Sequence, residues 1–297
     1  RLRDAYNHRE GIYSKVFPYR VLPEEMVSGS NEHLLFLTFV SGIAYHRKEE
    51  LLWNSARMTY SDPKTKYLFN PEKVLEVLPS DLEQDLLKYK LFVTPSEIKK
   101  WNVGKLKNID RSSVRENDLY IWVKMAKVLK KYDSDIKKLF EAFDNDALKL
   151  LKAFSETPYT NCFPEYSKER KVIIWLTRLK TISDLTVSNF ENLPVPIGSH
   201  IVRATFMTGA ISGKITSFQV DFEELLAEYW KTVYEERNTE FDETLVEFIP
   251  YLWFLSKFGC APGKVGNDCR NKAGCPVKDL CTTGKVEILD NYITIDN

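Results

Sequence analysis

The sequence predicts an all-α fold, in one large or two modest helical domains, on three observations. Apolar residues recur at helical spacing over most of the chain, as they do at Leu119, Trp122, Ala126 and Leu129. Prolines and N-capping residues interrupt the chain where one helix would end and the next begin. The hydrophobic share of the 297 residues is 43%, which is ample for the buried cores of one large or two modest domains.

The helices can be placed in order along the chain. Residues 31–45 are apolar on nearly all sides, which is typical of a central, buried helix. Ser30 precedes this helix, and its side-chain oxygen can accept a hydrogen bond from a backbone N–H of the first turn. Pro71 opens a short helix, where a first-turn proline is tolerated. We expect the further helices at residues 49–60, 71–78, from 79, from 95, 117–132, 133–154, 167–180, 200–208, 222–237 and 242–258.

The tail after Cys281 has a different pattern. Residues 285–289 and 292–295 are rich in β-branched residues and flank Asp290 and Asn291, which is the pattern of a small terminal β-hairpin. An isolated hairpin is marginally stable without packing.

Charge is balanced overall but unevenly distributed. The formal net charge is zero, which gives neither a global basic signature for nucleic acid nor an acidic signature for disorder. Residues 97–138 nevertheless hold twelve Lys and Arg against six Asp and Glu, whereas residues 221–247 hold two against ten. We therefore expect one face of the protein to meet an anionic partner.

Features that are absent from the sequence predict the cellular compartment of the protein and its oligomeric state. No stretch approaches eighteen uninterrupted apolar residues, so we expect no transmembrane helix and no membrane partner, and the N-terminus has no secretory signal. An odd number of cysteines, with Cys162 isolated, argues against a disulfide framework. We expect a monomer in a reducing, cytoplasmic compartment.

Four cysteines form the most informative pattern, within twenty-two residues at Cys260, Cys269, Cys275 and Cys281. Four thiolates can hold tetrahedral zinc or an iron–sulfur cluster. Structural zinc usually uses cysteines separated by two to four residues, whereas the shortest spacing here has five intervening residues. We therefore expect a [4Fe-4S] cluster, with zinc or unligated cysteines as the alternatives. If the cluster only holds the C-terminal segment together, its ligation energy is folding energy.

At this point the sequence resembles a known family. Residues 258–281 are similar to the C-terminal cluster loop of the endonuclease III-like DNA glycosylases, which belong to the helix–hairpin–helix superfamily. That family's usual spacing is C-x6-C-x2-C-x5-C, and in C-x8-C-x5-C-x5-C the last interval matches while the first two are longer. Residues 195–203 resemble the family's V-D-T-H-I-x-R segment, and residues 32–44 and 47–60 resemble its first buried helix and the helix that follows.

The resemblance implies a central, barrel-like helical domain at residues 31–195. Residues 1–30 together with 196–297 would form an iron–sulfur helical domain, with a cleft between the two domains. The implied function is base-excision repair of double-stranded DNA, in the cytoplasm or at the nucleoid, by a DNA glycosylase with or without AP lyase activity that acts on a flipped damaged base. The alternatives are a non-catalytic iron–sulfur protein that binds DNA lesions and a cluster protein with a protein partner.

The chain departs from the family at its catalytic positions. The position of the family's catalytic aspartate is Gly198, and glycine can neither stabilise an oxocarbenium charge nor prepare a nucleophile. Residues 161–166 lack the glycines of the family's hairpin. Lys168 and Lys171 are the nearest candidates for the lyase lysine, and their alternative role is that of solvated surface residues. Possible replacement carboxylates are Asp184, Glu191 and Asp221.

The candidate DNA-binding residues are cations of two regions. The basic face of residues 117–132 is either a solvated face or a track for phosphates, and lysines just upstream favour the track. Cations near the cysteines would position a duplex backbone without reading its sequence, whereas for Arg203 a structural role is favoured over a phosphate contact. The candidates are Lys124, Lys127, Lys131, Arg203, Arg270 and Lys272.

Overall fold

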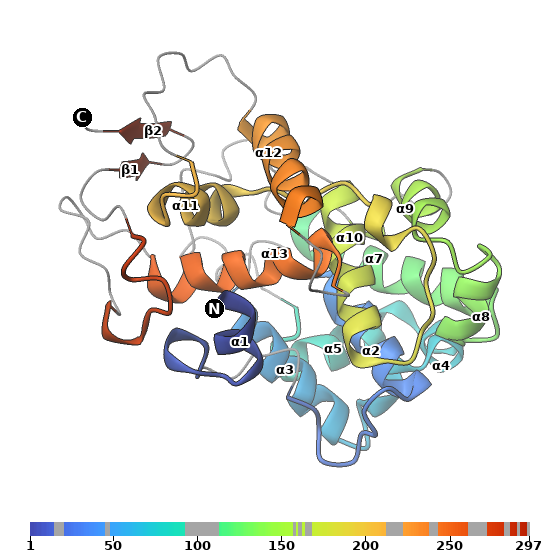
Figure 1. The fold of residues 1–297 in the computed structure, drawn as a ribbon. Helices are drawn as coiled ribbons and strands as arrows, with labels where there is room; N and C mark the ends of the chain where they lie inside the picture. Colours follow the sequence, from blue (N-terminus) through green and yellow to red (C-terminus); the bar gives the residue numbers. More distant parts are fainter. Residues whose placement is uncertain are drawn as a thin grey trace. The chain divides into compact units, whose positions relative to one another are not determined.

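The chain divides into two compact units, and most of it is helical (Figure 1). Unit 1 consists of Arg1–Val16 and Glu191–Asn297, and unit 2 consists of Phe17–Phe190. The structure, a computed structural model, describes residues 1–14, 21–44, 48–92, 113–156, 159, 162–163, 168–211, 222–237, 243–260, 272–281, 286–289 and 292–295.

Unit 2 is built around one buried helix. In α2 (Asn31–Gly42) every residue from His33 onward is buried. Ser30 caps this helix, because its Oγ accepts a hydrogen bond from the backbone N–H of His33 at 3.2 Å. The prediction of a central helix with a serine cap is confirmed. The other helices of the unit are α3 (Glu49–Ser61), α4 (Pro71–Glu76), α5 (Pro79–Lys88), α7 (Ser113–Lys130), α8 (Ile136–Glu141), α9 (Ala147–Ser155) and α10 (Lys168–Ile182).

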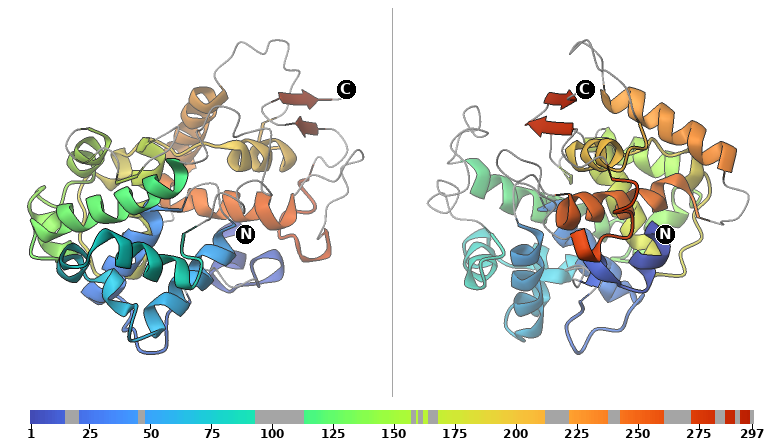
Figure 2. Two further views of the ribbon diagram at one scale, coloured as in Figure 1. Left: turned by 180° about the vertical axis from the view of Figure 1, so that it is seen from behind. Right: turned by 60° about the vertical axis from the view of Figure 1, so that its left-hand side comes forward.

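Aromatic side chains join these helices to α2. Phe39 stacks on Trp122 of α7 with ring centroids 4.7 Å apart, and the indole N–H of Trp175 on α10 donates to Thr38 Oγ1 at 2.9 Å. Accordingly α7 packs against α4 and α2, and α10 packs against α2 and α9 (Figure 2). Because Trp122 and Trp175 are fully buried, they contribute to the core and have no free face for a ligand.

One expected helix, over residues 133–154, is two helices in the structure. Asp144 and Asn145 adopt left-handed backbone angles, with φ of 57° and 52°, which these residue types tolerate better than most. The carboxylate of Asp146 then accepts hydrogen bonds from the backbone N–H groups of Leu148 and Lys149 and starts α9. The helix expected from residue 95 lies outside the described residues.

Residues 21–30 belong to unit 2, whereas the sequence predicted that they join the other domain. Arg57 on α3 donates to the carbonyl of Val21 at 3.4 Å, and Gly29 packs against the backbone of Ile182. These contacts fix the segment to unit 2. The later boundary lies at residues 190 and 191, against 195 and 196 in the prediction.

Unit 1 combines the first residues of the chain with its last third. Its helices are α1 (Leu2–Asn7), α11 (Ser199–Met207), α12 (Phe222–Arg237) and α13 (Leu245–Phe254). A capping box between Thr244 and Glu247 begins α13, and the helix widens into a π-helical turn at Leu255–Gly259. In the same unit β1 (Val286–Leu289) pairs antiparallel with β2 (Tyr292–Ile295), so the structure has a hairpin where the sequence suggested one.

None of the helices in the described ranges combines the length and the apolar character that crossing a bilayer requires.

Candidate metal centre and nucleic-acid interface

Three of the four clustered cysteines lie in the described part of unit 1. Cys260 directly follows the π-helical turn Leu255–Gly259, and Cys275 directly follows the 3-10 turn Lys272–Gly274. The side chains of Cys260 and Cys275 are buried, and that of Cys281 is half-buried. Cys269 lies outside the described residues.

Tyr13 indicates that Cys260 and Cys275 share one environment. Its side chain is fully buried, and its hydroxyl donates to the carbonyl of Tyr251 at 2.9 Å. Burial raises the pKa of Tyr13 strongly, and negative charge on the sulfurs of Cys275 and Cys260 raises this pKa further. The turn Gly11–Ser14, which contains Tyr13, also packs against Leu255–Gly259 and Lys272–Gly274, the two turns that directly precede Cys260 and Cys275.

The donor atoms suit a soft metal or an iron–sulfur cluster. Cysteine sulfur is the ligand preferred by zinc and by iron–sulfur clusters, and burial excludes water from such a site. Among the described residues no three His, Cys, Asp or Glu side chains come together as a metal-binding group. The structure thus places Cys260 and Cys275, two of the four predicted ligands, directly after two turns that pack against the same N-terminal turn, Gly11–Ser14.

The segment that resembles V-D-T-H-I-x-R begins α11 and is attached to the turn before Cys260. His200 Nδ1 lies 3.1 Å from Ser256 Oγ within the π-helical turn. The same imidazole meets Trp253 edge-on at 5.2 Å between ring centroids, and the ammonium of Lys257 lies 4.3 Å above that indole. Residues 195–203 are therefore attached through His200 to the segment that directly precedes residues 258–281.

Gly198 is the N-cap of α11. Its backbone is extended, with φ of −157°, a conformation that any residue adopts. No side chain caps this helix, and its first turn holds no acidic residue. Of the possible replacement carboxylates, Asp184 in unit 2 forms an exposed ion pair with Lys137 at 3.1 Å, which lowers its pKa. Glu191 is exposed, and Asp221 is outside the described residues.

Of the two lyase candidates, only Lys171 has a described side chain, and its ammonium binds a backbone carbonyl. The ammonium of Lys171, on α10, donates to the carbonyl of Ala44 at 2.8 Å, just beyond the end of α2. A lysine in that position satisfies a backbone carbonyl that the helix itself leaves unpaired. The side chain of Lys168, at the first position of α10, is outside the described part of the chain.

Lysines on α7 and directly after it lie beside an exposed tyrosine. We call Tyr120, Lys124, Lys127 and Lys131 the lysine stripe. Intervals of four and three residues place Tyr120, Lys124 and Lys127 on one side of α7, and Lys131 is in the turn that directly follows the helix. Tyr120 is 51% exposed, Lys127 and Lys131 are exposed, and Lys124 is half-buried. Within the described ranges no carboxylate forms a salt bridge with these three lysines.

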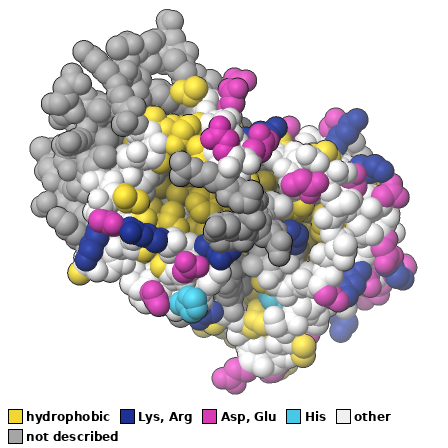
Figure 3. Space-filling view, in the orientation of Figure 1, with side chains coloured by type: hydrophobic (Ala, Val, Ile, Leu, Met, Phe, Trp, Pro, Cys, Tyr) yellow, Lys and Arg dark blue, Asp and Glu magenta, His cyan; other side chains and the backbone are white. Residues whose placement is uncertain are grey.

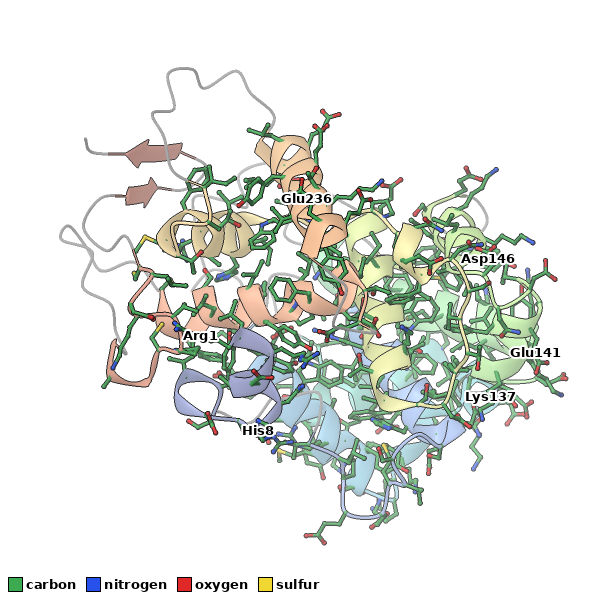
Figure 4. All side chains as sticks on the ribbon, in the orientation of Figure 1. Arg1, His8, Lys137, Glu141, Asp146 and Glu236 are labelled. Carbon is green, nitrogen blue, oxygen red and sulfur yellow. The ribbon has the colours of Figure 1, made fainter. Side chains whose placement is uncertain are left out.

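Exposed lysines of α8 and α9 differ from the lysine stripe in this respect. Lys137 and Lys138 of α8 pair with Asp184 and Asp133, and Lys149 of α9 pairs with Asp144. Figure 3 shows basic and acidic side chains mixed on the face of unit 2 that it draws, and Figure 4 shows Lys137, Glu141 and Asp146 at the surface of α8 and α9. These three lysines pair with carboxylates, whereas the lysines of the stripe have no salt bridge within the described part of the chain.

The remaining predicted DNA contacts are less accessible or are not described. Arg203 is half-buried on α11. Arg270 and the side chain of Lys272 lie outside the described residues.

Two residues of the structure were missed by the sequence patterns. Tyr13 has no motif, and nothing in the sequence marks it as a neighbour of Cys260 and Cys275. Asp118 is completely buried in α7, one turn before Trp122. Its position in the apolar register of α7 is the signal that would have identified it as a buried carboxylate.

Comparison of the chain with known proteins found no matching family model, no matching curated protein and no matching solved structure.

Proposed function

We propose that the protein binds damaged double-stranded DNA in base-excision repair and holds a [4Fe-4S] cluster through Cys260, Cys269, Cys275 and Cys281. The observation that carries this proposal is the link between His200 and Ser256. It connects the segment that resembles the glycosylase active-site helix with the turn that leads into the cysteines. Such a neighbourhood is expected of a scaffold in which a cluster supports a DNA-binding domain.

The lysine stripe supplies the second argument, for a polyanionic partner. Lysines without carboxylate partners bind phosphates and release the counterions condensed on a duplex, which favours association. An exposed aromatic ring among lysines can also stack on an unpaired base. Tyr120 and the three lysines therefore fit a nucleic acid better than an acidic protein, for which the aromatic residue has no specific use.

Within this proposal, the protein acts as a glycosylase on a base that is flipped out of the duplex. When bound, the cluster supplies a rigid support for the C-terminal segment of unit 1. The reacting groups would have to come from side chains, and the missing carboxylate at Gly198 must be replaced by another one.

A second candidate function is lesion binding without catalysis. Gly198 offers no carboxylate, and the amine of Lys171 is engaged by the carbonyl of Ala44. Both observations favour a retained scaffold whose chemistry is lost. Recognition would then depend on the lower cost of unstacking a damaged base.

The cofactor is tested by metal analysis of anaerobically purified protein. We expect iron and acid-labile sulfide in equal amounts, a brown colour and broad visible absorbance. Cys275→Ser should lose the colour, whereas Cys162→Ser, at the isolated buried cysteine of unit 2, should retain it. Zinc without iron, or colour that survives Cys275→Ser, would contradict the cluster assignment.

DNA binding and catalysis are separated by two assays on the same duplexes. Fluorescence anisotropy should show tighter binding to a duplex with an abasic-site analogue than to the undamaged duplex. Release of a damaged base, or borohydride trapping that Lys168→Ala or Lys171→Ala abolishes, supports the enzyme. Binding without release or trapping supports the second candidate, and no binding even at low salt excludes both.

A further inference from the structure

Gly11 makes a backbone contact that no other residue type could make. It begins the 3-10 turn Gly11–Ser14 with a left-handed φ of +53°. A Cβ atom built on Gly11 would lie 2.0 Å from the carbonyl oxygen of Gly274. Because the obstructing atom is backbone, no side-chain rotation could relieve the clash. Gly274 directly precedes Cys275, so any displacement there moves a predicted ligand.

Ile12 makes a corresponding contact at the other cysteine. Its side chain is buried, and a Cβ atom built on Gly259 would lie 3.1 Å from Ile12 Cδ1. Gly259 directly precedes Cys260. Two consecutive residues of the N-terminal turn therefore pack on the two glycines that directly precede the buried cysteines.

Tyr13 completes the contact between the two turns. Its hydroxyl donates to the carbonyl of Tyr251, in the helix that leads into the turn before Cys260. The ring of Tyr6 packs on Tyr13 and on Tyr251, at 5.5 Å and 4.5 Å between centroids. The turn is thus held by α1 on one side and by α13 on the other.

We propose that Gly11, Ile12 and Tyr13 are positioning residues for the metal centre: they hold the turns before Cys260 and Cys275 together, so that both sulfurs are in place before a cofactor binds. We call this tripeptide the N-terminal clasp. The proposal rests on the proposed role of these cysteines as ligands. Its physical basis is preorganisation, since ligands already held at the correct separation lose less conformational freedom on binding.

The test uses the full chain in cofactor-free and cofactor-containing forms. Gly11→Ala is the perturbing variant. Gly29→Ala is the matched control, because Gly29 also has a left-handed φ, of +76°, but lies in unit 2, where a Cβ atom would stand 3.3 Å from Ile182 O. In the cofactor-free protein, alkylation of each cysteine is followed by peptide mass spectrometry, with the buried Cys162 as an internal reference.

We expect Gly11→Ala to accelerate alkylation of Cys260 and Cys275 about tenfold relative to Cys162, which corresponds to about 1.4 kcal/mol of local opening free energy. Gly29→Ala should leave this ratio unchanged. In the cofactor-containing protein, Gly11→Ala should lose its visible absorbance about tenfold faster than wild type under a chelator.

Unchanged alkylation ratios in Gly11→Ala would contradict the proposal that the N-terminal clasp positions Cys260 and Cys275. If Gly11→Ala does not fold, Ile12→Ala serves in its place. It removes only the side chain against Gly259, and should expose Cys260 more than Cys275. Equal exposure of both would also contradict the proposal. Absence of iron in wild-type protein would refute the proposed cluster, yet the alkylation ratios would still decide whether the clasp positions these cysteines.

Discussion

His200 Nδ1 lies 3.1 Å from Ser256 Oγ, and Ser256 is completely buried in the π-helical turn before Cys260. A typical intramolecular hydrogen bond contributes about 0.5–1.5 kcal/mol, and the half-buried His200 can bind water when its partner is removed. We therefore expect Ser256→Ala to lower the free energy of unfolding by about 1 kcal/mol. Thr232→Ala on α12, where the hydroxyl is exposed, is the control and should change it by less than about 0.5 kcal/mol. Equal effects in urea titrations would show that the link is not structural.

A buried ion pair should stabilise unit 2 more than an exposed one. Arg178 Nη2 lies 2.8 Å from Glu49 Oε1, and the two side chains are only 11% and 19% exposed. Arg178 also lies over the ring of Trp53. Loss of one partner of a buried pair costs about 3–5 kcal/mol, so Glu49→Gln should reduce the free energy of unfolding by several kcal/mol.

The control for this pair is Asp184→Asn. The pair between Lys137 and Asp184 is exposed, at 49% and 78%, and such pairs contribute at most about 1 kcal/mol. Thermal or urea unfolding of the two variants gives the comparison. Equal destabilisation would mean that the pair between Arg178 and Glu49 stabilises the protein no more than an exposed pair does.

His33 makes the stability of unit 2 depend on pH. Burial lowers the pKa of this imidazole from its ordinary value of 6.5 to about 4, and Nδ1 accepts a hydrogen bond from the backbone N–H of Gly29 at 3.1 Å. Between pH 4 and pH 6.5 the unfolded chain therefore binds a proton at His33, whereas His33 stays neutral in the folded chain. The contribution of neutral His33 to the free energy of unfolding is fully present above pH 6.5. It declines by about 3 kcal/mol as the pH falls toward 4.

The comparison that isolates His33 is with His33→Asn, whose Oδ1 can accept the same hydrogen bond from Gly29. The free energy of unfolding is measured by urea titration between pH 7.5 and 4 in about half-unit steps. The variant should lose less stability over this window than wild type. Parallel curves would assign the acid sensitivity to other groups.

The lysine stripe should determine the salt dependence of DNA binding. Each phosphate contact contributes about 0.9 to the slope of log K against log salt on B-form DNA. Lys127→Glu combined with Lys131→Glu should reduce this slope by about two. Lys138→Glu combined with Lys149→Glu makes the same change in net charge at lysines that already pair with carboxylates. If both double variants behave alike, net charge and not the lysine stripe governs binding.

Gly198→Asp tests whether the scaffold can accept a carboxylate at the start of α11. The extended backbone of Gly198 permits the substitution, and aspartate is a better N-cap than glycine by a few tenths of a kcal/mol. Thermal unfolding should show an equal or slightly higher midpoint. If the proposed glycosylase function is correct, base release from damaged duplexes should rise in this variant, because the substitution supplies the carboxylate that Gly198 lacks. Destabilisation would contradict the capping geometry.

The sequence predicted the helices well wherever apolar spacing and a cap agreed, as at Ser30 and α2. It failed over residues 133–154, because the apolar residues keep a helical spacing through the break. The break depends on left-handed Asp144 and Asn145 and on the cap at Asp146, which periodicity does not detect. The clustering that singled out Cys260 and Cys275 could not reveal Tyr13, because Tyr13 is far from them in the sequence and only tertiary packing brings its turn to the turns before these cysteines.

The contact between Gly11 and Gly274 also constrains the order of events during synthesis. Unit 2 lies in the sequence between the two parts of unit 1, and domains generally fold as they emerge from the ribosome. The turn Gly11–Ser14 therefore cannot make this contact until Gly274 has been translated. Unit 1 is thus completed only after the residues of unit 2 have been translated, whereas unit 2 can become compact while translation of the later part of unit 1 is still under way.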